Sequence, residues 1–172
     1  MQECKNEVLS LIEQAEETAK TTAEQLKRGS LTLALAESCT AGLVSGLLAN
    51  TSGASAVLWG SYVCYTKEAK VSMLDLKACE LDTNGLVSRF TACSMAEKAL
   101  QKSGANLAAA ITGLAGPAGD GSGVPVGTIW IAVALKDGNV QAQKLYFTGG
   151  RNEVRIRAAI AVLEMILNIT RT

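Results

Sequence analysis

The stretch that decides the fold is LTLALAESCTAG, residues 31–42. Its first half, Leu31 to Ala36, is apolar and predicts a buried strand. Four polar residues, Glu37 to Thr40, then follow in a row, and the small residues from Thr40 to Ala49 predict a helix. A strand that turns directly into a helix is the beginning of a βα unit, which indicates an α/β fold.

The rest of the chain alternates in the same way. The expected helices are residues 3–28, 67–74, 88–102 and 151–167, and the expected strands are 57–65, 107–111, 127–135 and 140–147. Asp137-Gly138 is a hairpin signal, so the sheet has an antiparallel member. We therefore expect a single domain over residues 1–172, an α/β three-layer sandwich with a mixed, mostly parallel sheet, on which the N-terminal helix, residues 1–29, packs.

Composition excludes several classes of protein. Sixteen basic residues balance sixteen acidic ones, which argues against a broad nucleic-acid surface. No apolar run reaches the roughly 18 residues that cross a bilayer, and the charged first segment is unlike a secretory signal. Five cysteines without CxxC spacing indicate free thiols in a reducing compartment. We expect a cytoplasmic protein that binds neither nucleic acid nor a membrane.

Histidine is absent from the chain. This excludes Ser-His-Asp and Cys-His triads and histidine-ligated metal centres, so a hydrolase of this sequence takes its base from Lys, Tyr or a carboxylate. A glycine-rich loop, Gly113 to Gly127, lacks both the GxxxxGK[ST] and the GxGxxG nucleotide motifs. Its glycines either let the backbone approach a ligand closely or only connect two strands.

Three polar clusters follow three of the expected strands. They are residues 37–40, residues 65–70 and the pair Thr112-Gly113. Ligands of α/β sheets bind beyond the carboxyl ends of the parallel strands. We therefore expect the three clusters to meet in one cleft.

Ser38 lies where the first strand turns into a helix. Its hydroxyl can attack an acyl carbon while free N–H groups of the helix hold the oxyanion. The alternative is that Ser38 or Thr40 only caps the helix. Cys39 is a rival nucleophile, because a thiol at the start of a helix has a lowered pKa, unless it is a buried structural cysteine.

A serine nucleophile needs a base, and without histidine lysine is the candidate. Lys70 lies one turn beyond Lys67 on a short helix that follows a strand. Burial near another cation lowers the pKa of a lysine, so Lys70 could take the proton of Ser38, with Tyr65 relaying or steering it. The alternative is that both lysines are solvated surface residues.

Arg151 begins the last expected helix after two glycines. An arginine there can bind a phosphate or carboxylate with two parallel hydrogen bonds, helped by the helix dipole. Arg155 lies one turn further on the same face. The alternative is an ordinary charged face, to which Arg157 is assigned.

Five motifs in this order resemble the C-terminal domain of the CinA family of competence/damage-inducible proteins. They are LALAESCTAG, SYVCYTKEAK, NGLVS, ITGLAGPAG…PVGTIWIA and FTGGRNEVR. That domain is similar to the stand-alone nicotinamide mononucleotide deamidases of the PncC type, and this chain is expected to be such a stand-alone form. The resemblance covers about Leu31 to the C-terminus. It implies a three-layer α/β/α sandwich, a homo-oligomer, and no metal or other cofactor.

The resemblance also implies an activity: hydrolysis of the carboxamide of nicotinamide mononucleotide to nicotinate mononucleotide and ammonia. Matched by motif, Ser38 is the nucleophile, Lys70 the general base, and Tyr65 assists the base. The same matching implies substrate binding by Thr40, Thr112, Gly113, Gly116 and Arg151. The alternative function is a non-catalytic nucleotide-binding module of the competence/damage-inducible type.

Three positions depart from the family pattern. Ala41 stands where the family usually has the first of two glycines, and Gly150 stands where an aspartate usually precedes the arginine. Asn84 precedes Gly85 where the family often has histidine. None of the expected serine, lysine, tyrosine, threonine and arginine residues is changed.

Overall fold

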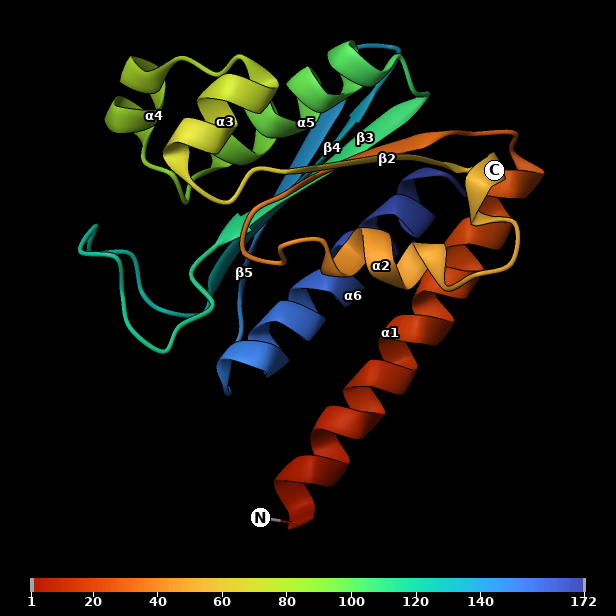
Figure 1. Ribbon diagram of the computed structural model, residues 1–172, viewed down its shortest axis with the longest axis horizontal. Helices are drawn as coiled ribbons and strands as arrows, with labels where there is room; N and C mark the ends of the chain where they lie inside the picture. Colours follow the sequence, from red (N-terminus) through yellow and green to blue (C-terminus); the bar gives the residue numbers. More distant parts are fainter. Residues whose placement is uncertain (1, 172) are drawn as a thin grey trace.

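A five-stranded sheet in the order β2-β1-β3-β4-β5 organises the molecule (Figure 1). The computed structural model describes residues 2–171. β1 pairs in parallel with β2 and β3, whereas β4 pairs antiparallel with both β3 and β5, which confirms the mixed, mostly parallel sheet. The strands are β1 Leu33–Glu37, β2 Leu58–Val63, β3 Leu107–Gly113, β4 Thr128–Leu135 and β5 Val140–Tyr146.

Helices cover both faces of this sheet, so the expected three-layer sandwich is confirmed (Figure 1). One face carries α1 Gln2–Arg28, α2 Leu43–Ala49 and α6 Arg151–Ile169. The other face carries α3 Lys67–Leu74, α4 Ala78–Asn84 and α5 Arg89–Ser103. A single 3-10 turn, η1 Ala54–Ala56, precedes β2.

The inner strand β1 alternates large and small side chains between the two layers. Leu33 and Leu35 lie in the core beneath α1, α2 and α6, and Ala34 and Ala36 lie in the core beneath α5. Successive side chains of a strand point to opposite faces, so this alternation gives the sheet a leucine face and an alanine face. The alanine face lets α5 pack close to the sheet.

The N-terminal helix α1 lies along α6 (Figure 1). Its inner face is a stripe at helical spacing, with Ala15, Ala19, Ala23 and Leu26 all buried. The amide of Gln25 donates to the backbone carbonyl of Leu167 near the end of α6, at 2.8 Å. Within residues 2–171, no helix is long and apolar enough to cross a membrane.

Most of the expected boundaries shift by one or two residues, and the structure departs further from the expected elements in two places. The helix expected from Thr40 begins at Leu43, because Ala41 and Gly42 have φ values of 52° and 90° and cannot join it. Residues 78–84 form α4, for which the sequence predicted no element. This short helix buries only Leu81, which is too little for a recognisable helical period.

Ala41 generates a prediction about stability. A left-handed conformation destabilises a residue with a Cβ by roughly 1–2 kcal/mol. A glycine avoids this strain, but it lowers the free energy of unfolding by about 0.4–1 kcal/mol because it gives the unfolded chain more freedom. We therefore expect Ala41→Gly to raise the free energy of unfolding by about 0.5 kcal/mol, measured by urea denaturation.

The matched control is Ala161→Gly, inside helix α6. It should lower the free energy of unfolding by about 0.5–1 kcal/mol, because an interior helical glycine carries no compensating relief of strain. Equal losses in the two variants would show that Ala41 is not strained.

Candidate active site

The three polar clusters meet at the carboxyl ends of β2, β1 and β3, as the sequence predicted. The backbone N–H of Ser38, just after β1, donates to Ile111 of β3 at 3.0 Å. On the other side of β1, the N–H of Cys64 donates to the carbonyl of Glu37 at 2.9 Å. These two bonds bring the three strand ends side by side.

A cavity of about 160 Å³ lies at this edge of the sheet. Seven of the eight expected site residues line it: Ser38, Tyr65, Lys70, Thr112, Gly113, Gly116 and Arg151. The lining also includes residues that the sequence did not single out as substrate contacts: Cys39, Leu86, Val87, Leu114, Ala115 and Asp120. Thr40, the eighth expected residue, is fully buried and does not line the cavity.

Lys70 is buried, with an exposed fraction of 1%, so it is not a surface lysine. The hydroxyl of Thr66 accepts from the N–H of Ala69 at 3.1 Å, which begins α3 at Lys67 and places Lys70 one turn later. The Nζ of Lys70 lies 2.8 Å from the Oγ of Ser38. It also donates to the backbone carbonyls of Cys64 at 2.9 Å and Tyr65 at 3.2 Å.

Burial lowers the pKa of Lys70 from its ordinary value. The expected like charge of Lys67 is not a cause, because Lys67 pairs with Asp82 instead. A neutral lysine has two N–H donors and one lone pair. Nζ donates to all three oxygens, and the hydroxyl of Ser38 donates to the carbonyl of Tyr65 at 3.4 Å. Once the amine is neutral, with its two donors on the carbonyls of Cys64 and Tyr65, its lone pair can accept the hydroxyl proton of Ser38. The arrangement is that of a nucleophile with its base.

Cys39 is a buried thiol and not an activated one. Burial raises its pKa to about 12, and it likewise raises the pKa of Cys64 to about 11. The lowered pKa expected for Cys39 is therefore wrong, and the alternative of a buried structural cysteine is confirmed. Ser38 is thus the better placed of the two candidate nucleophiles.

The N-terminus of α2 is capped by Glu37, which is fully buried. Its carboxylate accepts from the N–H groups of Gly42, Val44 and Ser45 at 2.9–3.1 Å, and from the hydroxyl of Ser61 at 3.2 Å. Neither Ser38 nor Thr40 caps this helix, and its N–H groups are not free for an oxyanion. In the sequence, the acidic residue just before the expected helix was the signal for this cap.

The turn that precedes α2 keeps N–H groups of its own. Within residues 2–171, the backbone N–H groups of Cys39 and Thr40 donate to no protein acceptor, and the hydroxyl of Thr40 is also unpaired. The N–H of the residue that follows a nucleophilic serine is a recurrent oxyanion donor. Cys39 holds that position here and lines the cavity.

Arg151 joins three segments at the mouth of the cavity. Its guanidinium donates to the carbonyl of Gly116 at 2.5 Å and to the hydroxyl of Tyr65 at 2.6 Å. The side chain of Tyr65 is half exposed, and its hydroxyl contacts Arg151, whereas its backbone carbonyl contacts Lys70. The helix start thus closes the cavity against the end of β2 and the glycine-rich loop.

Thr112 and Gly113 shape the floor. The hydroxyl of Thr112 donates to the carbonyl of Leu86 at 2.8 Å, which holds the segment after α4 beside the site. A Cβ on Gly113 would lie 2.6 Å from the carbonyl oxygen of Thr128, so no larger residue fits there. Both residues therefore position neighbouring backbone segments as well as lining the cavity.

Asp120 is a charged lining residue that the sequence analysis missed. Hydrogen bonds from the hydroxyl and the N–H of Ser122 lower the pKa of its carboxyl. Asp120 could have been singled out in the sequence, because it is the one acidic residue between Thr112 and Thr128. Its ionised carboxylate brings a negative charge to the cavity.

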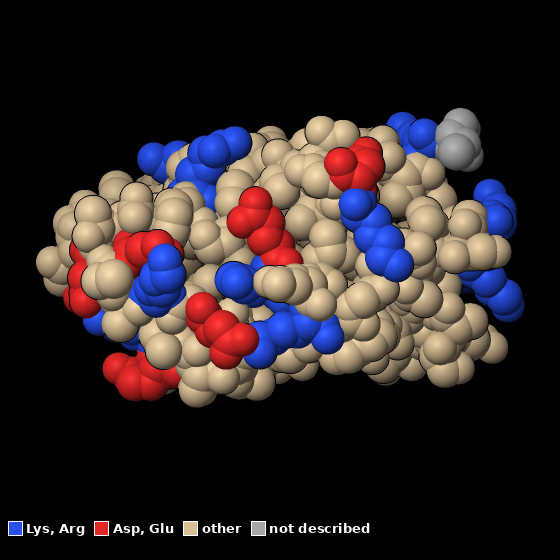
Figure 2. All heavy atoms as spheres, turned by 90° about the horizontal axis from the view of Figure 1, so that it is seen from above, with Lys and Arg blue, Asp and Glu red and all other residues tan. Residues whose placement is uncertain are grey.

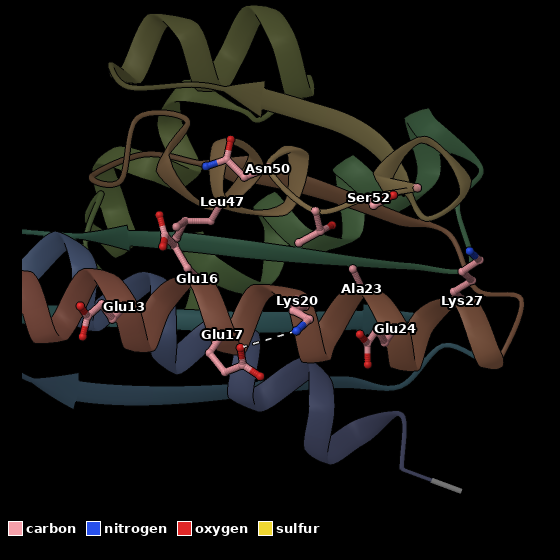
Figure 3. A pocket seen from close by; sticks show the side chains of 12 residues that line it. Glu13, Glu16, Glu17, Lys20, Ala23, Glu24, Lys27, Leu47, Asn50 and Ser52 are labelled. Carbon is pink, nitrogen blue, oxygen red and sulfur yellow. Dashed lines mark ion pairs between the residues drawn. The ribbon is translucent and has the colours of Figure 1, made fainter.

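A larger groove of about 650 Å³ lies elsewhere, between α1 and the segment after α2 (Figure 3). Glutamates and lysines of α1 line it, and Lys20 pairs there with Glu17 at 4.0 Å. The groove holds no pairing of a nucleophile with a base, so it is not the candidate active site. On the face shown in Figure 2, acidic and basic side chains form small groups separated by uncharged surface.

The part of the chain that the structure describes contains no group of three or more Cys, Asp or Glu side chains that could hold a metal ion.

The fold and the site define an α/β protein with a buried serine–lysine pair at the carboxyl edge of its parallel strands. The chain belongs to the CinA family: the model of the CinA C-terminal domain matches residues 15–170. A CinA-like protein of Mycolicibacterium gilvum is 41% identical over 135 residues, which cover 78% of this chain and 32% of that protein. The chain thus spans about a third of the length of the curated relatives that it matches.

Solved structures support the same assignment. The competence/damage inducible protein CihA from Agrobacterium tumefaciens is 39% identical with a TM-score of 0.88, over 92% of this chain and 96% of that one. A CinA superfamily protein from Klebsiella pneumoniae is 29% identical, also with a TM-score of 0.88, over 91% of this chain and 97% of that one.

The buried Lys70 predicts a dependence of stability on pH. The unfolded chain keeps its lysine protonated up to the ordinary value of 10.5, whereas the folded chain loses that proton at a lower pH. Between the two values the unfolded state binds more protons, so the free energy of unfolding rises with pH. Relative to Lys70→Met, the wild-type protein should therefore gain stability as the pH approaches 10.5.

Urea denaturation of both proteins at several pH values from 7 to about 10 measures this difference. Taking the difference between them removes the titration of the other groups. Parallel stability curves would contradict the lowered pKa of Lys70.

Proposed function

We propose that the protein hydrolyses the carboxamide of nicotinamide mononucleotide to nicotinate mononucleotide and ammonia. The observation that carries the chemistry is the buried hydrogen bond of 2.8 Å between Ser38 Oγ and Lys70 Nζ. The substrate is proposed from the resemblance of the five sequence motifs to the nicotinamide mononucleotide deamidases. CinA-family membership supports both parts of the proposal.

In the first half of the reaction, the neutral amine of Lys70 takes the hydroxyl proton of Ser38. The Oγ of Ser38 forms a bond to the carboxamide carbon, and the carbonyl oxygen becomes an oxyanion. The unpaired N–H of Cys39 is the nearest backbone donor in sequence to stabilise that charge. Lys70, now an ammonium, then donates its proton to the amide nitrogen, and ammonia leaves as the C–N bond breaks.

In the second half, a water molecule takes the place of ammonia. Lys70 accepts a proton from it, the water oxygen bonds to the acyl carbon, and the ester bond to Ser38 breaks as Oγ regains its proton. Nicotinate mononucleotide then leaves. Tyr65 assists through its backbone carbonyl, which accepts a hydrogen bond from Lys70 at 3.2 Å and keeps the lone pair directed at Ser38.

The cavity is suited to the reacting end of this substrate. Pockets that enclose drug-sized ligands measure roughly 300–1,000 Å³, so a cavity of about 160 Å³ encloses a ring with its amide and not a whole mononucleotide. The sugar phosphate then extends past the mouth, where Arg151 is positioned to bind an anion. The pyridinium ring is cationic, and the carboxylate of Asp120 provides a complementary charge.

Replacement of the nucleophile, the base and the rival thiol tests the mechanism. We expect Ser38→Ala and Lys70→Ala to lower kcat by about a thousandfold or more, because each removes one half of the pair. Cys39→Ala should retain most of the activity, because burial keeps that thiol protonated. Ammonia release from nicotinamide mononucleotide by the purified protein is the measurement.

Full activity in either Ser38→Ala or Lys70→Ala would overturn the mechanism. Loss in Cys39→Ala with activity kept in Ser38→Ala would assign the reaction to the thiol instead. Tight binding of the mononucleotide without turnover over hours would favour the nucleotide-binding alternative.

Asp120 supports a second test that concerns the substrate. An exposed charge pair contributes about 0.2–1 kcal/mol, so Asp120→Asn should raise KM for nicotinamide mononucleotide by about 1.4- to fivefold with little change in kcat. The control is Asp137→Asn in the β4–β5 hairpin turn, whose carboxylate accepts from the backbone N–H and the side-chain amide of Asn139. An equal effect of the two variants on KM would exclude a role of Asp120 at the ring.

A further inference from the structure

Arg155 contacts the turn that carries Ser38. It lies on α6, one turn after Arg151, and reaches the backbone between β1 and α2. Its Nε donates to the carbonyl of Cys39 at 3.2 Å, and its Nη2 donates to the carbonyl of Thr40 at 2.7 Å. One planar guanidinium thus holds two consecutive carbonyls, which a lysine ammonium would not hold in the same fixed geometry.

These contacts fix the directions of the N–H groups in the turn. In a trans peptide the C=O and the N–H point in opposite directions. A carbonyl of Cys39 turned toward Arg155 therefore turns the N–H of Thr40 away from it. The neighbouring peptide is fixed as well, because the carbonyl of Ser38 accepts from the N–H of Ala41 at 3.1 Å. The N–H of Cys39 belongs to that second peptide.

Glu37 holds the same turn from the other end. Its carboxylate binds N–H groups of residues 42, 44 and 45, while Arg155 binds carbonyl groups of residues 39 and 40. Two charged side chains of opposite sign thus take the backbone donors and the backbone acceptors of one short segment. Only the N–H groups of Cys39 and Thr40 are left unpaired there, within residues 2–171.

The turn needs such support because it contains an unfavourable conformation. Ala41 has a φ of 52° and Gly42 a φ of 90°, so two successive residues are left-handed. Strained backbone of this kind persists when the surrounding structure over-determines it. Without Arg155, the peptide that joins Cys39 to Thr40 is free to rotate, which would move the backbone beside Ser38.

We propose that Arg155 is a positioning residue for the reaction at Ser38. Its two hydrogen bonds keep the carbonyls of Cys39 and Thr40 away from the developing oxyanion. Because the carbonyl of Thr40 and the N–H of Ala41 belong to one peptide, the bond to Thr40 also directs the N–H of Ala41 toward the carbonyl of Ser38, and so leaves the N–H of Cys39 available to the oxyanion. The two hydrogen bonds also keep Ser38 in line with Lys70. This inference rests on the proposed function for its substrate, and on the geometry of the turn for the role of the residue.

The test compares Arg155→Met and Arg155→Lys with Arg157→Met. Arg157 lies on the same helix and pairs with the exposed Glu7 at 2.9 Å, so its replacement controls for the loss of a helix arginine. A displacement of about 1 Å at a reacting group costs on the order of a hundredfold in rate. We expect Arg155→Met to lower kcat about a hundredfold with KM within threefold, and Arg157→Met to resemble the wild type.

Chemical rescue distinguishes a positioning role from a general loss of structure. Added methylguanidine should restore part of kcat in Arg155→Met and none in Ser38→Ala, because it can bind the carbonyls of Cys39 and Thr40 in place of the lost side chain. Thermal melting of each variant shows whether it is folded. If Arg155→Met does not fold, Arg155→Lys replaces it in the test. Its kcat should fall while its KM stays within threefold of the wild-type value. A kcat within threefold of the Arg157→Met control would overturn the proposal.

A second measurement does not depend on the substrate. A fluorophosphonate probe reacts with an activated serine, and intact mass gives the rate of modification of Ser38. Slowing by Arg155→Met supports the positioning role even if nicotinamide mononucleotide is not hydrolysed, in which case the proposed function alone fails. An unchanged rate of modification would overturn the positioning role. A wild-type protein that neither hydrolyses the mononucleotide nor reacts with the probe would overturn both.

Discussion

The burial of the Glu37 carboxylate is the constraint on which the site depends. Removing a carboxylate from water is costly unless hydrogen bonds replace the lost hydration. Glu37 obtains them from three backbone N–H groups of the α2 start and from Ser61 of β2. Satisfying this one group therefore sets the distance between β1 and α2 and the tight turn between them. Ser38 is the first residue of that turn.

The second constraint is the burial of Lys70 against that turn. Burial disfavours the charged form of an amine and lowers the pKa of Lys70, and Nζ donates to the carbonyls of Cys64 and Tyr65. Those carbonyls follow β2, which pairs with β1, so the position of the amine beside Ser38 is set by the register of the sheet. Glu37 fixes the turn that carries Ser38, the proposed nucleophile, and the sheet fixes Lys70, the proposed base, each through backbone contacts.

Much of the architecture could be predicted from the sequence, and the contacts that tune the site could not. Hydrophobic periodicity indicated the layers, and the polar residues at the strand ends indicated where a ligand binds. The left-handed conformation of Ala41 leaves no trace in periodicity, so the expected helix began three residues too early. The burial of Lys70 and the reach of Arg155 to Thr40, 115 residues away, arise only when α3 and α6 are packed.

The absence of histidine makes these backbone contacts decisive. An imidazole is a competent base near neutral pH without a large shift of its pKa, because its ordinary pKa is about 6.5. A lysine becomes one only where burial disfavours its charge, and burial also removes the water that could correct a misplaced donor or acceptor. A serine–lysine site must therefore be rigid where a histidine site can adjust. Glu37 bonds the N–H of Val44 and Arg155 bonds the carbonyl of Cys39, so in the proposed reaction these two charged side chains provide that rigidity on the two sides of Ser38.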